Sequence, residues 1–185
     1  MTRSGIALFD TAVGRCAIAW GERGIFGVQL PEASDAGTRQ RLRAPSGALD
    51  AEPPREVRDA IDAVVALLRG ERPEADPLRA LRLDMDGVPL FNRRVYEVTR
   101  AIAPGATLTY GEVAKRIGEP GAARAVGQAL GQNPFAPIVP CHRVLAAGGA
   151  AGGFSARGGV ATKLRMLLIE GAAFGAPGLF DDLPR

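Results

Sequence analysis

Apolar and polar positions alternate in short runs over the first part of the chain. Between residues 6 and 30, apolar runs are separated by turns rich in glycine and charged residues, which predicts three β-strands. A short helix is expected around residues 36–43. Apolar residues then recur at helical spacing from Val57 to Leu68, and Gly70 is expected to end this amphipathic helix.

One more strand is predicted before the pattern changes. Leu81, Leu83 and Met85 alternate with charged residues, as they would along a half-buried strand. Residues 1–88 are therefore expected to form a small N-terminal α/β domain, in which Cys16 and Trp20 serve as core or packing residues.

From residue 89 onward the pattern is helical. Apolar positions from Phe91 to Ile102 predict one helix, closed by the Pro104-Gly105 pair. Thr109 and Glu112 then have the spacing of a capping box, in which the threonine hydroxyl accepts from the Glu112 amide and the glutamate reaches back.

Two short helices are expected after this cap. The first extends from Val113 to Ile117 and stops at Gly118, and the second extends from Ala122 to Leu130 and ends at Gly131. Two short helices joined by a tight turn predict a helix-turn-helix. The second helix is rich in small residues, which permits close approach to another surface.

Charge is distributed unevenly along the 185 residues. The net charge is +3, but residues 1–88 hold 12 Lys and Arg against 14 Asp and Glu, whereas residues 89–170 hold 10 against 4. A basic half indicates a nucleic-acid partner, and a solvated basic surface is an equally good interpretation of the same numbers.

Composition excludes several classes of protein. No run of 18 or more apolar residues is free of charge, so no transmembrane helix and no membrane partner are expected. The N-terminus lacks the sustained apolar segment of a signal peptide, which favours a cytoplasmic protein. One histidine and two cysteines cannot assemble a zinc site of the usual type, so no metal is expected. Cys16 and Cys141 could pair, but a reactive Cys141 is favoured over a disulfide.

The candidate chemistry lies in the run Ile138-Val139-Pro140-Cys141-His142-Arg143-Val144, which holds the only histidine. A cysteine is a useful nucleophile only as the thiolate. The neighbouring imidazole can take the proton, and a neighbouring arginine is expected to favour the anion. The apolar residues before the cysteine are expected to anchor the segment in a core. A buried structural cysteine beside a satisfied histidine is the alternative interpretation.

Further motifs surround this run. In order and spacing they resemble those of the 6-O-alkylguanine-DNA alkyltransferases, also called methylated-DNA–protein-cysteine methyltransferases. The resemblance covers about residues 89–172 and is weak over residues 1–88. The matching motifs are Thr109-Tyr110-Gly111-Glu112-Val113-Ala114, Ala123-Arg124-Ala125-Val126-Gly127, Asn133-Pro134, Pro140-Cys141-His142-Arg143-Val144 and Leu167-Leu168-Ile169-Glu170-Gly171.

The resemblance implies both a fold and an activity. The fold is α+β, with a ribonuclease-H-like α/β domain over residues 1–88, a mostly helical winged-helix or helix-turn-helix domain over residues 89–172, and a tail over residues 173–185. The activity is DNA repair by irreversible transfer of the alkyl group from 6-O-alkylguanine in double-stranded DNA to Cys141, once per chain. A second candidate substrate is 4-O-alkylthymine. The resemblance implies a monomer and no cofactor.

The resemblance also implies catalytic roles. Cys141 is the acceptor, His142 deprotonates it through a bound water, and Glu170 orients the imidazole, as in a nucleophile–base–carboxylate triad. Glu170 lies in an apolar run, where an unpaired carboxylate would be costly. Asn133 braces the turn before the active site. Tyr110 helps to rotate the target nucleotide and delivers a proton to the leaving guanine.

Five residues are implied on the DNA and substrate side. Arg124 enters the base stack, Ala125 and Gly127 let their helix approach the DNA, and Ser155 hydrogen-bonds near the guanine oxygen. Arg143 is counted with them, although a role in folding or in stabilising the thiolate is the favoured interpretation. Base flipping is required because the exocyclic oxygen cannot be attacked inside a stacked duplex.

Three other classes compete with this interpretation. Alkyltransferase-like proteins bind the lesion without repairing it, but they replace the acceptor cysteine, which is intact here. A thiol hydrolase or acyltransferase could use Cys141 and His142, but nothing nearby resembles an oxyanion hole. A helix-turn-helix regulator would need a dimer interface, and none is visible in the sequence.

Overall fold

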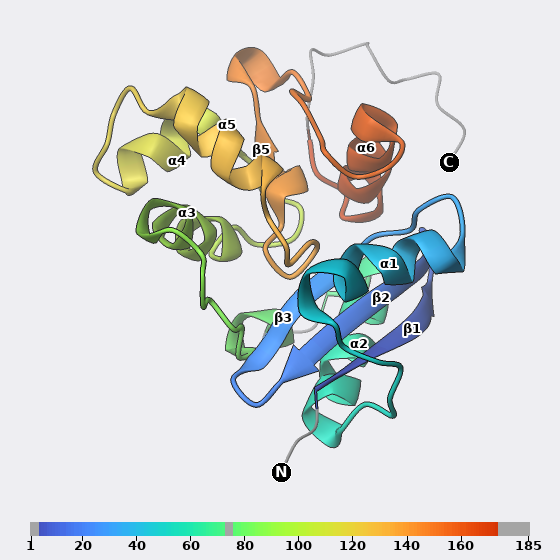
Figure 1. Cartoon of the computed structure of the whole chain (residues 1–185). Coiled ribbons are helices and arrows are strands. Elements are labelled where there is room, and N and C mark those ends of the chain that lie inside the picture. The colour runs from blue at the N-terminus through green and yellow to red at the C-terminus, as the bar shows by residue number, and fades with distance from the viewer. Residues whose placement is uncertain (1–3, 73–75, 174–185) are drawn as a thin grey trace.

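The computed structural model describes residues 4–72 and 76–173. Figure 1 shows a small sheet with its own helices at one end of the molecule and the helices of the C-terminal half at the other. The sheet is antiparallel in the order β1 (Gly5–Thr11), β2 (Gly14–Gly21) and β3 (Gly24–Gln29). The helices are α1 (Asp35–Ser46), α2 (Arg55–Leu68), α3 (Leu90–Arg100), α4 (Tyr110–Arg116), α5 (Ala123–Gly131) and α6 (Gly159–Ile169).

Helices α1 and α2 cover opposite faces of the sheet. Strand β2 supplies both cores, because successive side chains of a strand point to opposite faces. Ala17 and Ala19 pack in the cluster that includes α1, whereas Cys16, Ile18 and Trp20 pack in the cluster that includes α2. The predicted three strands, both helices and the core roles of Cys16 and Trp20 are confirmed.

The prediction of a strand over residues 81–85 is wrong. A 3-10 turn occupies Pro77–Ala80, and within the predicted strand only Leu83 forms a parallel bridge, to Ile25 of β3. The alternation of apolar and charged residues reflects an extended connection whose side chains are half-buried, and it does not add a strand to the sheet.

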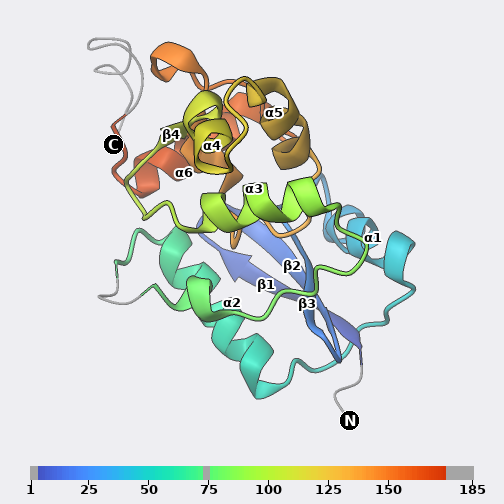
Figure 2. The ribbon, with the colours of Figure 1, turned by 90° about the vertical axis from the view of Figure 1, so that its left-hand side faces the viewer.

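The predicted helices of the C-terminal half are present. Figure 2 shows α3 between the sheet and the pair α4–α5. The capping box is confirmed, since Thr109 Oγ1 accepts from the Glu112 amide at 3.2 Å and Glu112 Oε2 accepts from the Thr109 amide at 2.6 Å. Because this cap fixes the first turn, α4 begins at Tyr110, ahead of the predicted start at Val113.

A second sheet was not predicted. Strand β4 (Leu108–Thr109) pairs in parallel with β5 (Val144–Leu145). This pairing brings the chain just after Cys141–Arg143 beside the chain just before Tyr110. Each strand is too short to leave a periodic signal in the sequence.

The segment before Cys141 joins the two parts of the molecule. The Val28 amide of β3 donates to the Pro134 carbonyl at 2.8 Å. Ile138 packs in the core of the sheet, whereas Val139 packs in the core of the C-terminal helices. The chain that leads to Cys141 is therefore held from both sides.

No helix within residues 4–72 and 76–173 is long and apolar enough to cross a membrane. Of the predicted C-terminal tail, only Ala173 lies within the described residues. Both cysteines are free thiols, as expected.

Candidate active site

A tight backbone turn presents Cys141. Pro140 precedes a 3-10 turn over Cys141–Arg143, and β5 follows directly. The predicted apolar anchor is confirmed, because Ile138 and Val139 are fully buried. Cys141 retains 7 % of its surface, and this small exposure lies where two clefts meet.

The structure brings His142 and Glu170 together across 28 positions of sequence. His142 Nε2 lies 2.8 Å from Glu170 Oε1. Arg143 donates to the same carboxylate from Nε and Nη2, each at 2.8 Å, and its Nη1 donates to the Ile102 carbonyl at 2.5 Å. All three side chains are almost completely buried. The expectation that a carboxylate in this apolar run would be paired is confirmed.

The charge states follow from this pairing. Burial alone would raise the pKa of Glu170, but the hydrogen bonds from His142 and Arg143 lower it to about 2. Burial lowers the pKa of His142 despite the opposing effect of Glu170. A neutral imidazole beside a carboxylate carries its proton on Nε2, which leaves the lone pair on Nδ1. Nδ1 has no hydrogen-bond partner among the described residues.

The expected effect of Arg143 on the thiol is not observed. Burial raises the pKa of Cys141, while the Asn133 amide and the positive charge of Lys163 act in the opposite direction. Arg143 is 2 % exposed and its guanidinium is held by Glu170 and Ile102, which favours the role in folding; its contact with DNA or substrate stays a prediction. The thiol is therefore neutral at rest and needs a base.

Lys163 is a functional candidate that sequence reasoning missed. It is fully buried on α6, and its Nζ donates to the Val144 carbonyl at 2.6 Å. Nζ also lies 5.7 Å from the centre of the Tyr110 ring, over its face. Burial lowers the pKa of Lys163 to about 8. The sequence did contain a signal for Lys163. It lies at helical spacing from Met166, Leu167 and Glu170, so it shares the buried face of α6 with them.

Asn133 holds the turn that leads to Cys141. Its Nδ2 donates to the Val139 carbonyl at 2.8 Å, and its Oδ1 accepts from the Phe135 amide at 2.9 Å. These two bonds span the turn, which is the geometry that a bracing residue requires.

A cleft of about 510 Å³ gathers most of the remaining candidates around Cys141. Tyr110, Arg124, Gly127 and Ser155 all line it. Burial raises the pKa of Tyr110, so its hydroxyl is protonated at neutral pH. Ala125 is half-buried on α5 and is not among the lining residues.

A second cleft, of about 260 Å³, reaches Cys141 from the side of the N-terminal sheet. Gln29, Glu32 and Arg41 of the N-terminal part line it together with Asn133 and Ser155. The N-terminal residues of this lining were not predicted, since nothing in residues 1–88 indicated chemistry.

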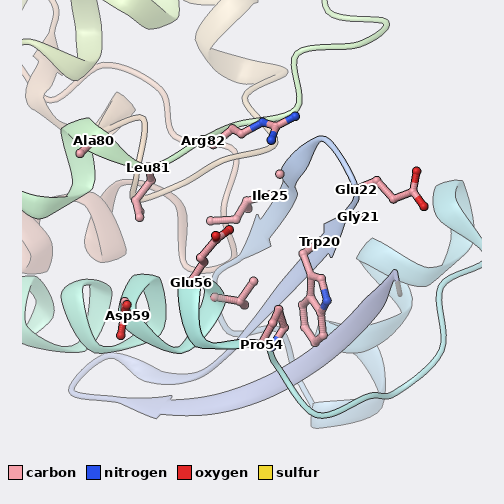
Figure 3. A pocket seen from close by; sticks show the side chains of 12 residues that line it. Trp20, Gly21, Glu22, Ile25, Pro54, Glu56, Asp59, Ala80, Leu81 and Arg82 are labelled. Carbon is pink, nitrogen blue, oxygen red and sulfur yellow. The ribbon is translucent and has the colours of Figure 1, made fainter. Parts of the chain in front are cut away.

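The groove of about 540 Å³ in Figure 3 lies elsewhere, at the far end of the sheet. Trp20 and Pro54 line it together with the carboxylates of Glu56 and Asp59 on α2. Its lining contains no cysteine or histidine. Among the residues that the structure describes, no group of three or more His, Cys, Asp or Glu side chains could hold a metal ion.

The C-terminal half of the chain resembles known proteins. Residues 90–172 match the family described as 6-O-methylguanine DNA methyltransferase, DNA binding domain. The methylated-DNA–protein-cysteine methyltransferase of Mycolicibacterium paratuberculosis is 44 % identical over 64 % of this chain and 68 % of that protein. The enzyme of the same name from Methanothermobacter thermautotrophicus is 35 % identical over 84 % of this chain and 79 % of that protein.

A solved structure extends the similarity to the whole fold. The Mycobacterium tuberculosis protein OGT, crystallised in complex with DNA, superposes with a TM-score of 0.70 at 32 % identity, over 93 % of this chain and 96 % of that one. The match therefore includes the N-terminal sheet as well as the site. Together with the sequence relatives, it shows that the chain belongs to the family of methylated-DNA–protein-cysteine methyltransferases.

Proposed function

We propose that this protein repairs DNA by transferring the alkyl group of 6-O-alkylguanine to Cys141. The observation that carries the proposal is the buried array of Cys141, His142 and Glu170 beside a cleft that Tyr110 and Arg124 also line. Membership of the family supports the same reaction.

His142 removes the proton from Cys141 in this proposal. The imidazole is neutral because burial lowers its pKa, and Glu170 holds Nε2, so Nδ1 is the basic atom. Nδ1 takes the thiol proton directly or through one water. Glu170 stays ionised throughout and stabilises the imidazolium that forms.

Sulfur then attacks the alkyl carbon bound to the guanine oxygen. The S–C bond forms as the O–C bond breaks, and the electron pair of that bond stays with the guanine, which gains a proton. Tyr110 delivers this proton, since its hydroxyl is protonated and lines the same cleft as Cys141. The product is a thioether, so each chain acts once and needs no cofactor.

DNA engages the side of the cleft formed by α4 and α5, which act as a helix-turn-helix. The exposed Arg124 enters the base stack in place of the flipped nucleotide, while Ala125 and Gly127 let α5 approach the backbone. Binding to double-stranded DNA is then driven largely by phosphate contacts and falls with rising salt. The related OGT, crystallised in complex with DNA, supports DNA as the partner.

The architecture fits the same proposal. Residues 1–88, with a sheet between α1 and α2, form a ribonuclease-H-like domain, and residues 89–172 form the winged-helix domain that carries the site. We expect a monomer that works in the cytoplasm.

Intact-mass measurement tests the function. The protein is incubated with a duplex that carries one 6-O-methylguanine, beside a Cys141→Ala control. We expect a gain of one methylene mass, never more than one per chain, and none in the control. Binding of the duplex without any gain would favour a lesion-binding protein, and absence of both would reopen the thiol hydrolase.

A further inference from the structure

Three glycines form a seam where the end of α2 meets the end of α6. Gly70, Gly105 and Gly171 have φ angles of 82°, 83° and 60°, which L side chains rarely adopt. A Cβ at Gly70 would lie 2.9 Å from the Ile169 carbonyl oxygen, and one at Gly105 would lie 3.0 Å from that of Glu170. The chain that follows α2 is therefore packed directly on the residues that end α6.

Arg72 occupies this glycine seam. Its Nη2 donates to the backbone carbonyl of Glu170, across 98 positions of sequence. A Cβ at Gly171 would lie 2.7 Å from that nitrogen, and one at Gly105 would lie 3.5 Å from it. Both glycines thus leave open the space that the guanidinium fills.

The backbone carbonyl of Glu170 needs a hydrogen-bond donor from outside the helix, because Glu170 is the C-cap of α6. Its amide donates to Met166, but the last carbonyls of a helix have no partner within the helix. Basic side chains satisfy such carbonyls and interact favourably with the helix dipole. The carboxylate of Glu170 is held separately, by His142, Arg143 and the Gly105 amide at 3.4 Å.

We propose that Arg72 is a positioning residue for alkyl transfer, through which the N-terminal domain fixes the backbone of Glu170 so that its carboxylate meets His142. This inference rests on the proposed function. Arg72 touches neither the thiol nor the cleft around it, so its effect passes entirely through Glu170.

The test compares Arg72→Ala and Arg72→Lys with the control Arg69→Ala. Arg69 is an exposed arginine at the end of α2, and no side-chain hydrogen bond of Arg69 is found among the described residues. The measurements are the rate of transfer from a saturating 6-O-methylguanine duplex as a function of pH, the affinity for the same duplex, and urea-induced unfolding.

For Arg72→Ala we expect transfer to slow about tenfold with unchanged DNA affinity, because a small misplacement of a catalytic group is costly. The acid limb of the pH profile should also move to lower pH. Four charged or titratable groups face His142, namely Glu170, Arg143, Lys163 and Cys141. Only Glu170 is loosened by the substitution, and Glu170 is the one that raises the pKa of His142.

Arg72→Lys keeps the charge without the planar fork and should lose rate only several-fold. If Arg72→Ala does not fold, the rate and pH profile of Arg72→Lys test the positioning role instead. A rate equal to that of Arg69→Ala, or a slower rate with an unmoved acid limb and only lower stability, would overturn the positioning role. If the wild-type protein forms no alkylated Cys141, the proposed function itself fails. If the wild type is alkylated and the Arg72 variants react at the rate of Arg69→Ala, only the positioning role fails, so the two failures are distinguishable.

Discussion

Replacing Glu170 with glutamine tests whether one buried carboxylate holds the site together. Glu170 accepts from His142 Nε2 and from Nε and Nη2 of Arg143, each at 2.8 Å. Glutamine has nearly the same size but turns one acceptor into a donor, and it leaves the guanidinium of Arg143 buried without a counter-ion.

The magnitude follows from the pKa of Glu170, which the folded chain lowers from 4.5 to about 2. A shift of that size corresponds to about 3 kcal/mol of folding free energy. Since the folded pKa lies below the unfolded one, this stabilisation is complete above pH 4.5 and is lost as the pH falls toward 2. Removing one partner of a buried ion pair costs about 3–5 kcal/mol, which agrees with this value.

Urea-induced unfolding at pH 7 and at lower pH values measures the effect. Glu170→Gln should unfold with about 3 kcal/mol less free energy at pH 7, and the difference from wild type should shrink as the solution is acidified. The control is Leu168→Gln, because Leu168 is 50 % exposed on the same helix. The reasoning would be refuted if Glu170→Gln were as stable as the wild type at pH 7, or if the difference in unfolding free energy between the two did not vary with pH.

Three further predictions concern neighbouring residues. Asn133→Ala loses the bonds to Val139 and Phe135 and should lower the free energy of unfolding by about 2 kcal/mol, again measured with urea. Arg124→Ala should slow repair in duplex DNA far more than reaction with free 6-O-benzylguanine, compared by intact mass over time; equal losses would contradict a role in the base stack. Lys163→Met should abolish a rise in stability between about pH 8 and pH 10. The wild type shows this rise because the folded pKa of Lys163, about 8, lies below the usual value of 10.5, so the unfolded chain binds more protons there. Parallel stability curves for the two proteins over that range would refute a lowered pKa of Lys163 in the folded protein.

Local signals predicted most of the fold. The helix from Val57 to Leu68, the capping box of Thr109 and Glu112, and the strands of the first sheet depend on neighbours close in sequence. The strand over residues 81–85 failed because alternation records burial on one side of the chain, and an extended connection has that property without pairing.

The candidate site could be predicted only in part. The motifs identified Cys141, His142 and Glu170, but the pairing of His142 with Glu170 depends on how α6 packs against the turn after Pro140. The spacing of Lys163 in the apolar stripe of α6 was a readable signal. Arg72 left none, since it lies in a polar stretch and acquires its contact only when α2 and α6 meet.

The burial of Cys141 affects how long its thiol survives before a substrate reaches it. Oxidants attack the thiolate, and at 7 % exposure, with a pKa raised by burial, this sulfur stays protonated and covered. Burial raises the pKa of Cys16, the other cysteine, to about 11, so it offers no easier target. The packing around the sulfur therefore slows the reaction of Cys141 with peroxides and dissolved alkylating agents, and preserves the thiol until a substrate reaches it.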